Sequence, residues 1–84
     1  KIDPTIWIIF ETNISFRAEA NGHYLVKIFN LQGVEVATLL DDNLLGKTDH
    51  KLNLDGQQLR EGIYLAVLIK DGRVITTKKM IRMK

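Results

Sequence analysis

The fold is decided by one apolar stretch in the last third of the chain, Gly62-Ile63-Tyr64-Leu65-Ala66-Val67-Leu68-Ile69. A run of consecutive apolar residues, rich in β-branched and aromatic types and flanked by turn-forming residues, is typical of a strand that is covered on at least one face. The turn signals are Glu61-Gly62 before the run and Asp71-Gly72 after it. We therefore expect a central strand on which the rest of the chain pairs or packs.

Composition limits what the chain can be. Its 84 residues, 45% hydrophobic and 26% charged, correspond to one small globular domain. The absence of cysteine excludes disulfides, thiolate metal sites and a thiol nucleophile. A net charge of +2 is far from the dense basic face of a nucleic-acid-binding protein, so we expect no nucleic-acid partner. No apolar run approaches the roughly 18 residues of a membrane span, and the first residues lack the layout of a signal peptide.

Turn signals at regular spacing divide the chain into short apolar segments. Asn21-Gly22 and Asp71-Gly72 are typical of type I′ hairpin turns, and Asn30-Leu31-Gln32-Gly33 is typical of a type I turn. The segments between the turns alternate apolar and polar residues, as half-buried strands do. We expect strands over residues 5–10, 13–18, 23–29, 34–40, 49–54, 62–69 and 73–83. This pattern predicts an all-β fold, an immunoglobulin-like antiparallel β-sandwich of about seven strands.

Alternation also predicts the core and the character of the last strand. In residues 73–83 the apolar phase is interrupted by Lys79, so we expect either a β-bulge or a terminal edge strand that its lysines protect from indiscriminate pairing. Leu59, between two glycines, is expected to drop inward and cap the core. The predicted core residues are Ile14, Phe16, Tyr24, Val26, Ile28, Val36, Leu52, Leu54, Leu59, Tyr64, Ala66 and Leu68.

No residue pattern indicates catalysis, a cofactor or a metal. Asp41-Asp42-Asn43 lacks the alternating oxygen ligands, the glycine and the distal glutamate of a calcium loop, and a solvated turn accounts for it better. His23 and His50 lie on separate strands with no paired cysteine and no convincing carboxylate spacing, and we interpret both as strand-surface residues rather than as ligands or bases. Trp7 is interpreted as a packing residue at a sheet edge, and an exposed platform for sugar is the alternative.

An ordered set of short segments resembles a known family. The segments are residues 26–39, then Leu54-Asp55-Gly56 with Leu59, then Gly62-Ile63-Tyr64, then Thr77-Lys78-Lys79-Met80-Ile81. Together they resemble the C-terminal sorting domain of proteins exported by the type IX secretion system of Bacteroidetes and their relatives. The resemblance covers residues 13–84, and it leaves residues 1–12 as a linker or an additional edge strand.

The resemblance implies a function without catalysis. Such a domain is part of a larger secreted cargo, often a hydrolase or an adhesin, and the outer-membrane export machinery reads it. In many members a sortase-like surface protease then removes the domain and attaches the cargo to an anionic lipopolysaccharide at the cell surface. Members of the family imply two groups of site residues here. The recognition residues are Thr77, Lys78, Lys79, Met80, Ile81 and Lys84, and the architectural residues are Gly33, Asp55, Gly56, Gly62 and Tyr64.

One departure from the family pattern suggests a partner. The outward phase of the central strand carries Leu65, Val67 and Ile69, where relatives tend to have polar residues, and this predicts an exposed apolar stripe. We expect residues 5–10 to fold over this stripe or pair beside it, or a second copy of the domain to cover it as a homodimer. The alternative to an export signal is a resident accessory module that binds carbohydrate or acts as a spacer, as the similar domain of flagellar hook-capping proteins indicates.

Overall fold

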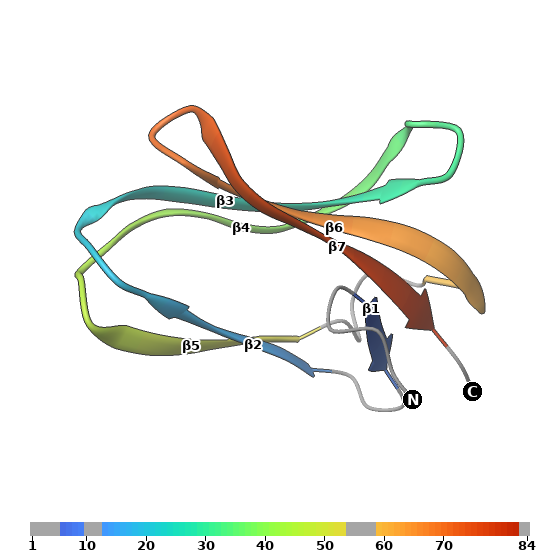
Figure 1. Ribbon diagram of the computed structural model, residues 1–84, viewed down its shortest axis with the longest axis horizontal. Coiled ribbons are helices and arrows are strands. Elements are labelled where there is room, and N and C mark those ends of the chain that lie inside the picture. The colour runs from blue at the N-terminus through green and yellow to red at the C-terminus, as the bar shows by residue number, and fades with distance from the viewer. Residues whose placement is uncertain (1–5, 10–12, 54–58, 83–84) are drawn as a thin grey trace.

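A computed structural model describes residues 6–9, 13–53 and 59–82 of the chain, and these residues form strands and their connections (Figure 1). The predicted Leu54, Asp55, Gly56 and Lys84 lie outside the described residues. The strands are β1 (Ile6–Ile9), β2 (Asn13–Ala18), β3 (Gly22–Asn30), β4 (Glu35–Leu44), β5 (Thr48–Asn53), β6 (Gly62–Lys70) and β7 (Arg73–Arg82).

The strands form two layers. The larger sheet has the order β1-β7-β6-β3-β4, and the smaller one consists of β2 and β5. Figure 1 shows β2 and β5 in one layer facing β3, β4, β6 and β7 in the other. The predicted all-β sandwich is therefore confirmed, and β6 is the middle strand of the larger sheet, as its unbroken apolar sequence predicts. One pair departs from the antiparallel pattern, because β1 runs parallel to β7.

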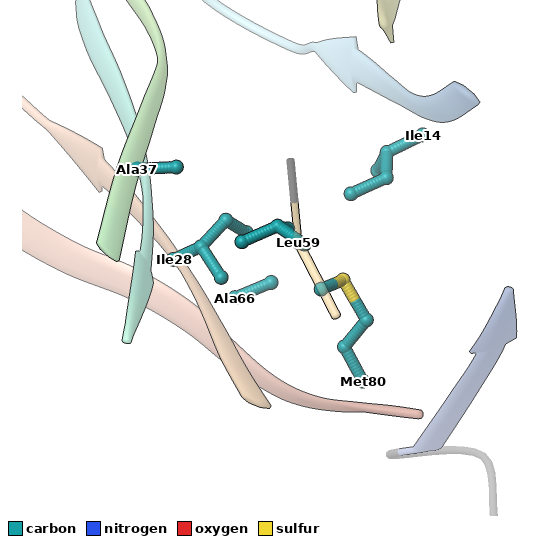
Figure 2. Close-up of a cluster of buried hydrophobic side chains, with 6 residues drawn as sticks. All are labelled: Ile14, Ile28, Ala37, Leu59, Ala66 and Met80. Carbon is teal, nitrogen blue, oxygen red and sulfur yellow. The ribbon is translucent and has the colours of Figure 1, made fainter. Parts of the chain in front are cut away.

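The core lies between the layers, where side chains of both inner faces meet (Figure 2). Most of the predicted core is confirmed as buried, whereas Phe16, Tyr64 and Leu68 are half-buried. The buried residues are Ile14, Ala18, Tyr24, Val26, Ile28, Ala37, Leu52, Leu59, Ala66 and Met80.

The prediction that Val36 is a core residue is wrong, because β4 contains a register shift. Ile28 pairs with Ala37, and the next residue, Phe29, pairs with Glu35. Val36 is thus an extra residue opposite this step, and its side chain is 39% exposed while Ala37 is buried. A bulge reverses the phase of a strand, so simple alternation assigns the wrong residue to the core.

Two of the three predicted turns are confirmed. Asp71 and Gly72 have φ angles of 50° and 80°, the left-handed pair of a type I′ turn, and they join β6 to β7. In the β3–β4 turn the Asn30 side-chain oxygen accepts hydrogen bonds from the backbone N–H groups of Gln32 and Val34, each at 3.0 Å. Gly33 closes this turn with a φ of 84°, which glycine adopts without strain.

The third predicted turn is wrong, because β2 and β3 belong to different sheets. Asn21-Gly22 is part of a crossing between layers, and Gly22 begins β3 opposite Leu44. The Tyr24 hydroxyl donates a hydrogen bond to the Ala20 carbonyl at 2.6 Å and fixes this crossing. The expected turn at residues 41–43 is also wrong. These residues continue β4, where they pair with residues 23–25.

The crossing between β2 and β3 is packed against the loop that joins β4 to β5. The Gly46 N–H donates a hydrogen bond to the Asn21 side-chain oxygen at 2.6 Å, and a Cβ at Gly46 would lie 2.9 Å from the Ala20 Cα. We expect Gly46→Ala to lower the free energy of unfolding by about 1–3 kcal/mol, because the methyl group meets backbone that cannot rotate away.

Urea unfolding of Gly46→Ala and Gly22→Ala measures this effect. The methyl group at Gly22 meets the tip of the flexible Lys70 side chain first, at 2.8 Å from Cε. Gly22→Ala should therefore cost less than Gly46→Ala, and equal losses would contradict a backbone clash at Gly46.

Candidate recognition surface on the last strand

The last strand, β7, lies inside the larger sheet over part of its length. Its last four residues, Lys79–Arg82, pair with β6 on one side and with β1 on the other. Residues 73–77 pair with β6, and no strand among the described residues pairs with them on the opposite side. The expected terminal edge strand is therefore wrong for residues 79–82, because β1 covers that edge in parallel register.

The expected bulge is present, although not at Lys79. Leu68 pairs with Thr76 and Ile69 pairs with Val74, which leaves Ile75 as the extra residue of β7. Ile75 is 52% exposed. The bulge re-sets the phase of the strand before the lysines begin, so Lys78 pairs with the buried Ala66 and falls on the inner face, while Lys79 falls on the outer face.

Alternation along β7 divides the predicted recognition residues into two groups. Lys78 is half-buried on the inner face, and Met80 is fully buried in the core with 0% exposure. Thr77 and Lys79 are exposed on the outer face, and Ile81 is half-buried beside them. In the folded domain Met80 presents no side-chain surface to a partner.

The outer group adjoins apolar side chains of the central strand. Ile81, Lys79 and Thr77 pair with Ile63, Leu65 and Val67, respectively. Leu65 and Val67 are half-buried, and Ile63 is 40% exposed. We call these six residues the outer patch: Ile63, Leu65, Val67, Thr77, Lys79 and Ile81.

The predicted apolar stripe at Leu65, Val67 and Ile69 is half-buried rather than fully exposed. β1 does not lie beside it in the sheet, because β7 separates β1 from β6. The outer patch is the part of this face at which Lys79 adjoins apolar side chains. A second lysine, Lys27 of β3, pairs with Val67 from the other side of β6. The side chain of Trp7 lies outside the description, although Trp7 pairs with Met80 through the backbone of β1.

The predicted architectural residues that the structure describes are Gly33, Gly62 and Tyr64. Tyr64 lies near the start of β6, and its hydroxyl donates a hydrogen bond to the Arg60 carbonyl at 2.8 Å. Such a bond from an early residue of this strand to the preceding connection is typical of immunoglobulin-like domains. Arg82, near the end of β7, also contacts this connection, because its Nε donates a hydrogen bond to the Leu59 carbonyl at 3.2 Å. The role of Arg82 is not apparent from the sequence, because it depends on a contact between distant segments.

The histidines and acidic residues are engaged in local contacts. His23 Nε2 lies 2.7 Å from Asp41 Oδ1, a carboxylate on the neighbouring strand β4, and the His23 side chain is 43% exposed, so His23 lies on the strand surface. His50 stacks on Phe16 with ring centroids 5.5 Å apart, and its Nε2 lies 2.7 Å from the Thr48 hydroxyl. Within the described residues no group of three potential ligands could hold a metal ion.

Two carboxylates have lowered pKa values. The backbone N–H of His23 donates to Asp71, and together with Lys70 it lowers the pKa of that carboxyl. Hydrogen bonds from Lys27 and Thr38 lower the pKa of Glu35. Both groups are charged at neutral pH. Lys27 lies on the outer face of β3, and its charge is compensated by Glu35, whose Oε1 lies 3.0 Å from the Lys27 Nζ.

Comparison with known proteins identifies the family. The described residues contain no helix that is long and apolar enough to cross a membrane. No curated protein and no solved structure matches the chain. The family model of the secretion system C-terminal sorting domain matches residues 10–83, which is almost the whole chain and includes the strands that form the outer patch. The chain therefore belongs to the secretion system C-terminal sorting domain family, whose members are sorting signals for type IX secretion.

Proposed function

We propose that this domain marks a larger cargo protein for the type IX machinery of the outer membrane, and that the machinery reads the outer patch of the folded domain. The observation that carries this proposal is the position of Thr77, Lys79 and Ile81. These members of the family's terminal stretch lie on one face of the sheet, next to Ile63 and Leu65.

The chemistry of the outer patch suits protein recognition. Partly exposed apolar side chains supply contact area, and the adjacent Lys79 ammonium supplies attraction to an acidic receptor surface and fixes the orientation of docking. A domain recognised in this way binds and does not catalyse. The contact between the Thr48 hydroxyl and His50 does not indicate an activated nucleophile, because this hydroxyl donates its hydrogen bond to the Leu45 carbonyl at 2.6 Å.

The remaining steps follow from the family and are part of the proposal. The cargo crosses the periplasm and then the outer membrane of a bacterium of the Bacteroidetes type, and residues 13–84 act as the address. A sortase-like surface protease then removes the domain, and the cargo is attached to the cell surface. Residues 1–12 connect the address to the cargo, and within them Ile6–Ile9 also complete the sheet as β1.

A reporter fusion tests the export proposal. Residues 1–84 are fused to the C-terminus of a periplasm-targeted fluorescent protein and expressed in a bacterium that carries the type IX machinery. We expect the reporter outside the cell, and we expect it in the periplasm when the machinery is deleted. A fusion that is folded and intact but stays in the periplasm of the competent strain would sink the proposal.

We also propose that the apolar stripe of the central strand, which shares Leu65 and Val67 with the outer patch, allows two copies to associate as a homodimer in competition with the receptor. Leu65, Val67 and Ile69 share one face of β6 and remain partly exposed in the single chain. Light scattering over a range of concentrations should show a dimer that Leu65→Gln with Val67→Gln converts to a monomer. A wild-type protein that is monomeric at every concentration would contradict self-association.

A further inference from the structure

We propose that β1 keeps the junction between cargo and domain closed to proteolysis, so that the domain is cut from its cargo only after β1 has left β7. Such a gate acts on the removal step of the proposed function and therefore rests on that function. It is a property of the folded domain, separate from the outer patch and measurable without the export machinery.

The position of β1 in the chain places it at the junction. The family match begins at residue 10, so a cut that releases the whole matched domain falls before that residue. The four residues directly before the match are Ile6–Ile9, and they form a strand of the larger sheet. The pairing of this segment with β7 is thus a feature of this chain that the family match does not include.

Pairing with β7 closes the segment to a protease. Ile6–Ile9 lie beside residues 79–82 in parallel register (Figure 1). A protease takes its substrate as an extended segment and forms backbone hydrogen bonds along it, as an added strand does, and it cuts most readily at exposed, unpaired segments. On the side of β1 that faces β7, the five-stranded sheet occupies the space that one wall of a protease cleft needs. Cleavage within residues 6–9 therefore requires β1 to separate from the sheet first.

β1 is also the easiest strand to release among the described strands of the larger sheet. It has four residues and pairs there with β7 alone, whereas β6 has nine residues and pairs on both edges. Parallel pairing is slightly less stable per residue than antiparallel pairing. Local opening of so short an edge strand costs less free energy than unfolding of the whole domain. β1 can thus leave while β6, β7 and the core stay in place.

Release of β1 keeps the outer patch intact. Thr77, Lys79 and Ile81 are aligned by their antiparallel partners on β6, and β1 takes no part in that pairing. Recognition and removal are therefore controlled by different neighbours of the last strand, recognition by β6 and removal by β1.

The test compares the whole 84-residue chain with a synthetic peptide of residues 1–12. Chymotrypsin cuts after aromatic residues, and the Trp7–Ile8 bond lies within β1. Its hydrolysis consumes one water and leaves a carboxylate on Trp7 and an amino group on Ile8. Mass spectrometry follows the initial rate at which products that begin at Ile8 appear. We expect this rate to be at least about tenfold lower for the folded chain than for the peptide, because only molecules with β1 released are cut.

A disulfide that holds β1 in place completes the test. Ile8→Cys with Ile81→Cys joins partner positions of β1 and β7, and we expect the cut after Trp7 to be about tenfold slower with the bond formed than with the bond reduced. The matched control is Ser15→Cys with Lys51→Cys, which joins partner positions of β2 and β5. Its bond stabilises the domain without holding β1, so its oxidised and reduced forms should be cut at equal rates.

Three results would overturn the gate. Equal rates for the folded chain and the peptide would show that β1 is not held. Equal rates for the two forms of Ile8→Cys with Ile81→Cys would show that the cut does not depend on release of β1. Equal slowing by both disulfides would attribute the protection to the stability of the whole domain. Because all rates are measured on the purified chain, failure of the gate leaves the export proposal standing, and failure of export leaves these rates unchanged.

Discussion

The variant Met80→Ala is expected to lose about 2–4 kcal/mol of its free energy of unfolding, a large share of the roughly 5–10 kcal/mol available to a domain of this size. Met80 is fully buried, and in Figure 2 its side chain points toward Leu59 and Ala66. Removing its thioether leaves a cavity that the other residues of the core cluster would have to close. Urea denaturation followed by the fluorescence of Trp7, the single tryptophan, measures the loss.

Met80→Leu is the matched control. It conserves most of the volume and should cost less than about 1.5 kcal/mol. Lys79→Ala changes an exposed residue next to it in the chain and should stay within about 0.5 kcal/mol of the parent. If Met80→Ala were as stable as Lys79→Ala, the burial of Met80 described here would be wrong.

This prediction changes how mutations in the family's terminal stretch are interpreted. If Met80→Ala abolishes export, unfolding of the domain explains the loss. Met80→Leu, which keeps most of the stability, should then be exported normally. Export that is lost in Met80→Leu while stability is kept would instead require the receptor to read the methionine side chain, and therefore to bind this strand outside the folded sandwich.

The second large effect concerns Lys79 and export. We expect Lys79→Glu to reduce the amount of exported reporter about tenfold, because reversing one charge at the centre of a contact costs about 1.4 kcal/mol of binding free energy. The fold should be unaffected, since Lys79 is exposed on the outer face. Reporter fluorescence inside and outside the cell, corrected for expression, measures the reduction.

The matched control for Lys79→Glu is Lys51→Glu. Lys51 is an exposed lysine on β5, in the smaller sheet, and the substitution produces the same change in net charge. Equal export of both variants would contradict recognition through the outer patch and would attribute the effect to overall charge.

A disulfide between β1 and β7 tests whether the machinery reads side chains or backbone. Ile8 and Ile81 are partners in the parallel register of β1 and β7. Because the chain has no cysteine of its own, the double variant Ile8→Cys with Ile81→Cys can form only one disulfide, the one between these two positions. If the outer patch is read on the folded domain, this variant should be exported to the same extent with the bond formed as with the bond reduced, since both states carry the same Ile81→Cys substitution in the patch. Export that stops when the bond forms, and returns on reduction, would show that β1 must leave before the backbone of residues 79–82 is read.

Much of this architecture follows from local sequence. The unbroken apolar run of β6 predicts its central position, because a strand buried by neighbours on both edges and one face needs few polar side chains. Asp71-Gly72 and Asn30-Gly33 predict their turns, because the required φ angles are available to those residues at low cost. The terminal lysines, with the family's ordered segments, predict where an export signal is read.

Only the tertiary structure decided which edges and faces those elements present. The residue types of Asn21-Gly22 suit a hairpin, yet neither residue has a positive φ angle, and β2 and β3 separate into different layers because each buries its apolar face against the other sheet. The parallel pairing of β1 with β7 joins residues more than seventy positions apart, and no local preference encodes it. The bulge at Ile75 then turns Lys78 inward and Lys79 outward. Sequence alone determined the strands and the family, and long-range pairing decided which side chains of the last strand a partner can touch.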